Sequence, residues 1–385
     1  MTKTLLYTLA FVALGLITSS LGPTLPALAA HVHASTAEIS LLFVARATGI
    51  MIGALWLGKL YDRYAGHPLL AGALLAAAAT FACVPHLRWR WALALLFVLN
   101  GLASSILNVG GNTLIALVHG ARVGPFLGLI HFAFGVGGLL APLLASTVAT
   151  RPAALWWTYT LLAALVALAA LPLCFSPSPP LRPHAHSHTA HSQLNRTIVL
   201  LLLFFFFEVG GEASIAGWLF TYATARGLNE EAAFYLNSAF WAAFTLGRLV
   251  GIPLAMRFSE RHIVSAHLCI WVAFLLLSAC LPNVRLALWL LAVGSGLAMA
   301  PIFPMMIAFA QRALQVSGQI IGWLVVASAL AAMSWPWLIG QLFETYGAQV
   351  MIWVALFSLG LAAQVLFLLT RRAPLVVEVQ KSGAA

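Results

Sequence analysis

The chain has 385 residues, of which 62% are apolar and 7% are charged, and its formal net charge is +10. A soluble domain usually carries about 25% charged residues, so this chain cannot cover a water-exposed surface of its size. The composition excludes a cytosolic enzyme, a nucleic-acid-binding protein and a disordered chain. It predicts a multi-spanning membrane protein. Runs such as 69–81 and 198–207 are continuously apolar, which favours helices over the alternating strands of a barrel.

Each membrane crossing needs roughly 20 helical residues. Apolar runs bounded by charged residues, Pro and Gly predict an all-α membrane protein with twelve transmembrane helices in two six-helix bundles. The predicted helices lie near residues 5–29, 39–59, 68–85, 91–118, 123–149, 153–174, 197–225, 232–257, 263–281, 285–311, 316–343 and 347–371.

The longest polar stretch, residues 175–196, is rich in Pro, Ser and His. It separates an N-terminal bundle (1–174) from a C-terminal bundle with a short tail (197–385). Its histidines could bind a metal ion. They lack Cys and carboxylate companions, so we interpret the stretch as a plain cytoplasmic linker and predict no metal site. The histidines concerned are His184, His186, His188 and His191.

Lys and Arg are distributed unevenly over the loops. With the N-terminus in the cytoplasm, twelve of them fall on the cytoplasmic side and five on the outer side. Cytoplasmic loops are enriched in these residues, so both termini are predicted to be cytoplasmic and the location to be the inner (plasma) membrane. The first apolar run contains Pro23 and Pro26 and leads into a second, which favours a membrane helix over a cleaved signal peptide. The net charge is therefore mainly a signal of topology.

An internal repeat relates the two halves at an offset of 198 residues. Two glycines are followed by a base, an acid and a base in equivalent loops. Duplicated six-helix halves of this kind are typical of secondary transporters of the major facilitator type, whose substrate site lies near the midplane between the halves. The repeated residues are Gly49, Gly53, Lys59, Asp62 and Arg63, and Gly247, Gly251, Arg257, Glu260 and Arg261.

The first copy of this loop, residues 58–67, reads GKLYDRYAGH. It resembles the GxLxDRxGRR loop of the major facilitator superfamily, with His67 where a base is usual. The resemblance implies a conformational latch; a role in topology alone is the alternative. The predicted gating residues are Gly58, Asp62 and Arg63, their partial copy Glu260 and Arg261, and Arg248 on the cytoplasmic side.

Charges inside membrane helices are costly and mark functional sites. Glu208 and Glu212 lie four residues apart in the predicted seventh helix and share one face. Two carboxylates at this spacing repel, so at least one is expected to be protonated, to bind a cation or to pair with an arginine. These options suit a cation-coupled symporter. At 1.5 Å rise per residue, Arg46 reaches a depth similar to that of Glu212, which predicts an ion pair across the halves, with a gating or a purely structural role.

Other polar side chains are candidates for a substrate pathway. Asn108 and Asn112 continue a polar stripe on the fourth helix, and His131 on the fifth could donate to substrate or carry a proton. Aromatic rings and amides together suit a sugar, although Trp, Ser and Asn also serve packing. The remaining candidates are Trp218, Asn237, Trp241, Gln319 and Trp335.

Motifs of hydrolytic enzymes and the phosphate-binding loop are absent from the sequence. We therefore predict that the chain is not an enzyme and that an ion gradient supplies the energy.

Six segments resemble the sodium-dependent glucose transporter group, in the fucose-permease-like branch of the major facilitator superfamily. They are LGPTLP at 21–26, GGN at 110–112, HFAFG at 131–135 with Pro142, VGGEASIAGWLFTY at 209–222, FWAAFTLGR at 240–248 and IFP at 302–304.

The resemblance implies sodium- or proton-coupled sugar symport by alternating access. Asn112, His131, Glu212, Trp218 and Trp241 inherit the family pattern.

Two departures from the family pattern concern acids. Asn108 stands where relatives usually carry an acid, and Glu208 stands where they often carry an aromatic residue. One hypothesis is that an acid has moved from the fourth helix to the seventh.

The sequence thus predicts a secondary active transporter that moves a sugar or a similar polyhydroxylated solute across the inner membrane. H⁺ or Na⁺ is expected as the coupling ion, with no other cofactor. The expected partners are the substrate and the lipid bilayer, with no nucleic acid, and the protein is expected to be a monomer. An exporter of amphipathic drugs or lipids, or a non-transporting sensor on the same fold, are the alternatives.

Overall fold

The computed structural model describes residues 2–180, 195–313 and 318–372, and all regular elements within these ranges are helices. Twelve of the resulting segments are long and apolar enough to cross a membrane. The predicted all-α fold with twelve membrane helices is confirmed. The elements are α1 (Thr2–His31), α2 (Thr36–Ile39), α3 (Leu41–Trp56), η1 (Leu57–Asp62), α4 (Gly66–Cys83), η2 (Val84–His86), α5 (Arg90–His119), η3 (Gly120–Arg122), α6 (Val123–Val148), α7 (Ala154–Cys174), α8 (Arg196–Ala225), α9 (Glu230–Arg257), α10 (Glu260–Cys280), α11 (Val284–Met299), α12 (Ile302–Ala313), α13 (Gly318–Tyr346) and α14 (Val350–Arg372).

Two predicted helices are interrupted. The second consists of α2, α3 and η1, and the tenth is divided into α11 and α12. Pro301 lies at the second break; proline has no N–H to donate and disfavours helical backbone in the preceding residue. Asparagine side chains begin three helices: Asn195, Asn229 and Asn283 each accept a hydrogen bond from a backbone N–H in the first turn, which satisfies a donor that has no partner within the helix.

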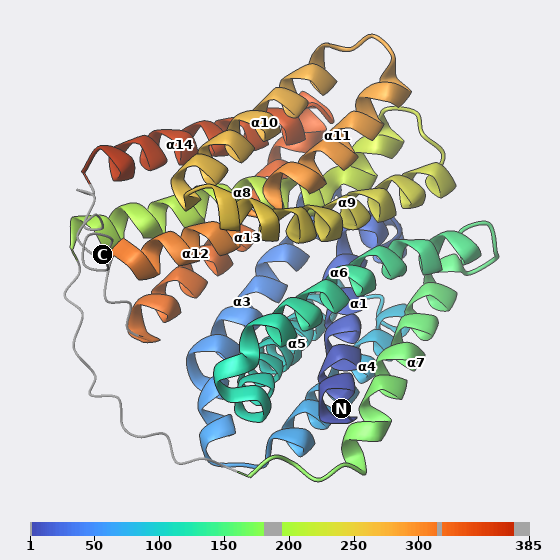
Figure 1. Cartoon of the computed structure of the whole chain (residues 1–385). Helices are drawn as coiled ribbons and strands as arrows, with labels where there is room; N and C mark the ends of the chain where they lie inside the picture. Colours follow the sequence, from blue (N-terminus) through green and yellow to red (C-terminus); the bar gives the residue numbers. More distant parts are fainter. Residues whose placement is uncertain (1, 181–194, 314–317, 373–385) are drawn as a thin grey trace.

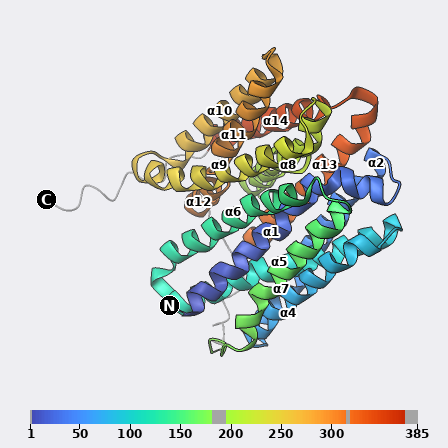
Figure 2. The ribbon, with the colours of Figure 1, turned by 90° about the vertical axis from the view of Figure 1, so that its right-hand side faces the viewer.

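The helices form two bundles, α1–α7 and α8–α14, that lie side by side (Figure 1). Within the bundles the contacts correspond: α1 packs on α6 as α8 packs on α13, and α3 packs on α5 as α9 packs on α11. Between the bundles α3 packs on α13 and α6 packs on α9, again as an equivalent pair, while α1 meets its counterpart α8. The N-terminus lies at the end of the molecule opposite α2 (Figure 2). The predicted linker falls largely on residues 181–194, which lie outside the described residues together with its histidines.

The repeated glycines explain part of this correspondence. A Cβ added to Gly49 on α3 would lie 2.0 Å from the Val98 carbonyl oxygen on α5. A Cβ added to Gly247 on α9 would lie 2.8 Å from the Leu297 carbonyl oxygen on α11. Each glycine therefore lets two helix backbones approach closely, as small residues do in membrane bundles. The repeat thus encodes the same helix contact in both halves.

Gly49→Ala should therefore destabilise the protein, because overpacking a close contact costs about 1–3 kcal/mol. Gly72→Ala is the matched control, since a Cβ there meets no atom within 4 Å and alanine favours the helix. Thermal unfolding in detergent should show a lower Tm for Gly49→Ala and an unchanged or higher Tm for Gly72→Ala. Equal Tm values for the two variants would contradict the close-packing role.

Candidate functional site

The carboxylates of α8 lie in the interior of the second bundle. Glu208 is fully buried, and neither of its carboxyl oxygens has a hydrogen-bond partner. Glu212, one turn further along the same helix, is half-buried. A buried ionised carboxylate without a partner is strongly disfavoured, so the region around Glu208 must supply a proton, an opposite charge or both.

Arg248 on α9 supplies the opposite charge. Its guanidinium lies within electrostatic range of both Glu208 and Glu212, and it rests over the Phe244 ring at 4.4 Å from the centroid. It also lies within electrostatic range of His131, which belongs to α6 of the other bundle. The sequence predicted Arg248 as a gate residue on the cytoplasmic side, and that role stays a prediction. The charges of Glu208 and Glu212 act on Arg248, without an ion pair to either acid among the described residues.

Arg46 has a different environment from the predicted one. Its Nη1 donates to the Thr18 carbonyl oxygen on α1 at 3.2 Å, and its Nε is buried without a partner. No ion pair joins Arg46 to Glu212 in the described part of the chain. The expected pair across the halves is therefore absent from this conformation, because equal depth in a helix does not fix the direction in which a side chain points.

The polar stripe of α5 divides into two parts. The Ser104 hydroxyl donates to the Asn100 carbonyl oxygen of its own helix at 2.8 Å, which is a packing role. The Asn112 amide donates to the side-chain oxygen of Asn108 at 2.8 Å, and Asn108 is exposed. His131 is half-buried and packs its ring edge-on against Phe11, with centroids 5.5 Å apart. The first bundle thus presents two amides and an imidazole.

The inward face of α9 carries polar atoms that lack partners. Asn237, Trp241, Phe244 and Arg248 are spaced by four, three and four residues, which aligns them on one helix face. Both amide atoms of Asn237 and the Trp241 indole nitrogen are buried without a hydrogen bond. Trp241 also packs edge-on against Phe134 of α6, with ring centroids 6.0 Å apart. This face therefore meets the other bundle with unsatisfied donors and acceptors.

Three other predicted substrate residues differ in their surroundings. The Trp218 indole donates to the Pro336 carbonyl oxygen at 2.9 Å and stacks on Phe343, so it holds α8 against α13. Trp335 is buried beside Phe206, and its indole nitrogen has no partner. Gln319 lies in α13, but its side chain lies outside the described residues.

The predicted gating loop contains a buried histidine that hydrogen-bonds two other segments of the chain. Asp62 and Arg63 are exposed at the end of η1, whereas His67 is fully buried at the start of α4. The His67 Nε2 hydrogen-bonds the Tyr7 hydroxyl at 2.9 Å, and its Nδ1 hydrogen-bonds the Ser176 carbonyl oxygen at 3.0 Å. The histidine that replaces the usual base therefore ties α1 and α4 to the segment that follows α7.

The other gating residues are placed as follows. Glu260 and Arg261 begin α10, where an acid is favourable to the helix dipole. Gly58 lies in η1, and nothing beyond its backbone is described.

The two bundles are closed at the end formed by residues 36–40 and 341–344. The Gln341 amide donates to the Ala37 carbonyl oxygen at 2.9 Å and to the Ser40 hydroxyl at 3.3 Å. The Thr36 backbone N–H donates to the Glu344 carboxylate at 2.7 Å. These bonds join α2 and α3 of one bundle to α13 of the other.

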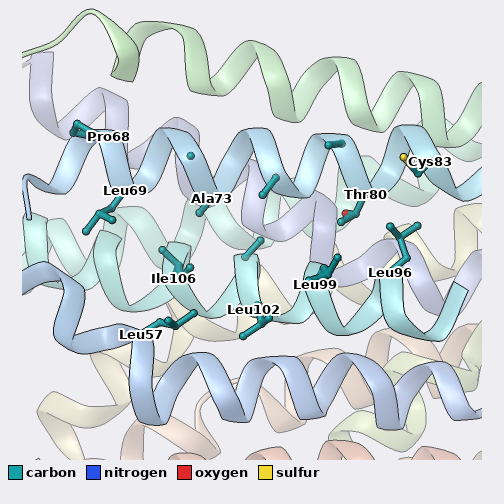
Figure 3. Close-up of a pocket in the computed structure, with 14 residues that line it drawn as sticks. Leu57, Pro68, Leu69, Ala73, Thr80, Cys83, Leu96, Leu99, Leu102 and Ile106 are labelled. Atoms are coloured by element: carbon teal, nitrogen blue, oxygen red, sulfur yellow. The ribbon is translucent and has the colours of Figure 1, made fainter. Parts of the chain in front are cut away.

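A groove between α4 and α5 is distinct from these polar residues (Figure 3). Its lining is almost entirely apolar and includes Leu69, Leu99 and Ile106. The Thr80 hydroxyl, its main polar group, already bonds to Ala77 and Asn100. Hydrocarbon chains suit such a surface, and a polyhydroxylated solute does not.

The sequence matches the Major Facilitator Superfamily profile over residues 7–252. The chain belongs to this superfamily. Its members are transporters, which confirms the prediction that the chain is not an enzyme.

The chain is 29% identical over 379 residues to the mouse (Mus musculus) sodium-dependent glucose transporter 1A, with 88% of each chain covered. Similar solved structures include the nucleoside transporter NupG, with a TM-score of 0.78, 17% identity and coverage of 95% of this chain and 98% of that one. A D-xylose–proton symporter has a TM-score of 0.75 and 15% identity, and the match covers 96% and 97% of the two chains. The fold and the resemblance to the glucose transporter group are thereby confirmed.

Replacing Gln341 by Ala should weaken the closed end, because it removes an amide that makes two bonds between the bundles. The two hydrogen bonds, at a net contribution of about 0.5–1.5 kcal/mol each, predict a shift of about five- to 150-fold toward the state that is open at this end. Phe43 lies on α3 and packs against Trp218 of the other bundle, with ring centroids 6.1 Å apart. The readout is the rate at which an impermeant maleimide labels the Phe43→Cys variant, in a background lacking the native cysteines. Gln364→Ala, an exposed Gln on α14, is the matched control, and equal labelling rates in the two variants would contradict the closure.

Proposed function

We propose that this protein is a cation-coupled symporter that moves a sugar or a similar polyhydroxylated solute by alternating access of its two bundles. The observation that carries the proposal is the interface between α6 and α9. There, buried polar atoms of Asn237 and Trp241 lack partners, and the charge of Arg248 acts on His131 across the interface. Buried polar groups are nearly always hydrogen-bonded, so a ligand with several hydroxyls would satisfy this face.

The side chains available suit a sugar. An asparagine amide offers both a donor and an acceptor, as a hydroxyl requires, and an indole offers an apolar face together with one donor. Asn112 and His131 from the first bundle, and Asn237 and Trp241 from the second, are the residues that we propose contact the solute. The names of the mouse glucose transporter and of the D-xylose–proton symporter support a sugar and a coupling cation.

The orientation is part of the proposal. The excess of Lys and Arg on one side supports cytoplasmic termini in the inner membrane. In this orientation the contacts between residues 36–40 and 341–344 close the outer side. We further propose that the protein acts as a monomer in the bilayer, without a nucleic-acid partner and without a cofactor other than H⁺ or Na⁺.

Replacing Trp241 by Phe tests the substrate site, because it keeps a ring and removes one donor. Loss of one hydrogen bond to the solute should raise the KM for sugar counterflow about three- to tenfold. Trp218→Phe is the same chemical change at an indole that already bonds to Pro336. It should lower the Tm and leave the KM within about twofold. The measurement is counterflow of radiolabelled hexoses and pentoses in proteoliposomes.

The outcomes separate the candidate functions. Counterflow of sugars with the expected KM pattern supports the proposal. Transport confined to amphipathic compounds would favour an exporter, and binding of a sugar without any counterflow would favour a sensor.

A further inference from the structure

We propose that the ion carried with the sugar is a proton held on Glu208, and that Arg248 is the charged partner that controls its release. The inference rests on the proposed symport and specifies its coupling ion. The proposed ion, a proton, differs from the sodium ion in the name of the mouse relative, a sodium-dependent glucose transporter.

The position of Glu208 suits a proton. The side chain is fully buried and neither oxygen has a hydrogen-bond donor within reach. A protonated carboxyl group is neutral, so it tolerates an apolar surrounding that an isolated carboxylate does not. The preceding turn of α8 is lined by Phe204 and Phe205, both fully buried, and Phe205 packs on Phe303 of α12. A neutral acid is the form that these surroundings favour.

The charges around Glu208 can be counted. Glu212 contributes a second carboxylate from the same helix, and Arg248 contributes one guanidinium. Two carboxylates and one guanidinium leave one negative charge. Glu208 is fully buried and shielded from water, whereas Glu212 and Arg248 are half-buried. One proton neutralises the set, and Glu208, the more deeply buried of the two acids, is the residue to carry it.

In the described part of the chain, Glu212 and Arg248 are the charged groups that act on Glu208. α1, α11, α13 and α14 also pack against α8. Their ionisable residues lie within two turns of the helix ends, whereas Glu208 lies near the middle of α8. These residues are Lys3, Tyr7 and His31 on α1, Arg285 on α11, Glu344 and Tyr346 on α13, and Arg371 and Arg372 on α14.

A sodium ion would need different surroundings. Hard cations such as Ca²⁺ and Mg²⁺ are held by about six oxygen ligands, and sodium, also a hard cation, needs a comparable shell. Among the described residues, no third His, Cys, Asp or Glu side chain joins Glu208 and Glu212, so the charged ligands available to such a shell are at most two carboxylates. The side chains that precede Glu208 on its helix are phenylalanines, and these supply no oxygen. A proton needs a single oxygen and no additional space.

Arg248 links the proton to the movement of the bundles. It lies on α9, which packs against α6 of the other bundle. Close contacts such as Gly135 with Thr245 and Gly138 with Trp241 hold these helices together. The charge of Arg248 acts on the two acids of its own bundle and on His131 of the other. A change in the α6–α9 contact therefore changes the surroundings of Arg248. This in turn changes the electrostatic potential that the Arg248 charge produces at Glu208.

The proton transfer balances as follows. A hydronium ion on one side of the membrane breaks one of its O–H bonds and becomes water, and its proton forms an O–H bond on a Glu208 carboxyl oxygen. After the bundles have rearranged, this O–H bond breaks, the carboxylate keeps the electron pair, and water on the other side takes the proton. Arg248 stabilises the carboxylate that remains.

The test uses the full chain in sodium-free proteoliposomes. A proton gradient should drive sugar accumulation by the wild-type protein, and adding a sodium gradient should not increase it. Glu208→Gln should reduce this accumulation at least tenfold and counterflow no more than about threefold, because the neutral amide resembles the protonated acid. Arg248→Gln should also lose accumulation, and Arg248→Lys should retain part of it. Glu231→Gln makes the same change at an exposed acid of α9 and should match the wild type.

Several results would overturn the proposal. These are wild-type accumulation that requires sodium and ignores the proton gradient, and full accumulation by Glu208→Gln. Absence of any counterflow by the wild type would instead refute the proposed symport itself. If Glu208→Gln fails to fold, proton uptake by the wild-type vesicles can be measured with a trapped pH dye. Sugar-dependent acidification of the lumen without sodium supports the proposal, and its absence overturns it.

Discussion

Two carboxylates and one guanidinium inside a membrane bundle impose the central physical constraint on this protein. Glu208, Glu212 and Arg248 lie in a chain with 7% charged residues, so each buried charge must be balanced by a neighbour or by a proton. The balance depends on α8 and α9 being held at a fixed separation. The close glycine contacts of α9 with α11, and the indole of Trp218 bonded to α13, hold these helices in place.

The two bundles share an architecture but differ in chemistry. Gly49 and Gly247 produce the same close helix contact in both halves. In the first bundle, however, Asn112 bonds to Asn108, and the Arg46 Nη1 bonds to the Thr18 carbonyl oxygen although its Nε has no partner. In the second bundle, Glu208 and Asn237 keep polar atoms without partners. The fully buried acid and amide that need a proton or a ligand therefore lie in the second half, and Asn112 and His131 of the first half are the residues proposed to contact the solute together with them.

Much of the architecture follows from the sequence. Apolar runs locate the twelve helices to within a few residues, because spanning a hydrocarbon layer demands length and apolarity that few other structures need. The repeat at an offset of 198 residues indicates the equivalence of the halves, and the structure supplies its reason at Gly49 and Gly247. The spacing of Glu208 and Glu212 identifies the region of the charged site.

The sequence does not reveal toward which neighbouring helix a given side chain points. Depth along a helix suggested Arg46 as the partner of Glu212, but Arg46 on α3 donates instead to the Thr18 carbonyl oxygen on α1. Arg248, predicted to be a gate residue, also interacts electrostatically with the two acids of α8, which its position in the sequence did not indicate. The burial of His67 also could not be predicted from the sequence, because its hydrogen bonds to Tyr7 and Ser176 join segments that are distant in sequence. Trp218 carries a family pattern, yet its hydrogen bond shows a packing role. Each of these contacts depends on rotation about helix axes, which a pattern along one helix does not specify.

The net charge moved with each sugar tests the central claim most directly. Reversal potentials of sugar-driven currents in proteoliposomes, recorded without sodium at a series of proton gradients, give the ratio of charge to sugar. One positive charge per neutral sugar is expected, because one proton neutralises the set formed by Glu208, Glu212 and Arg248. An electroneutral cycle, or a current that appears only when sodium is added, would contradict this explanation.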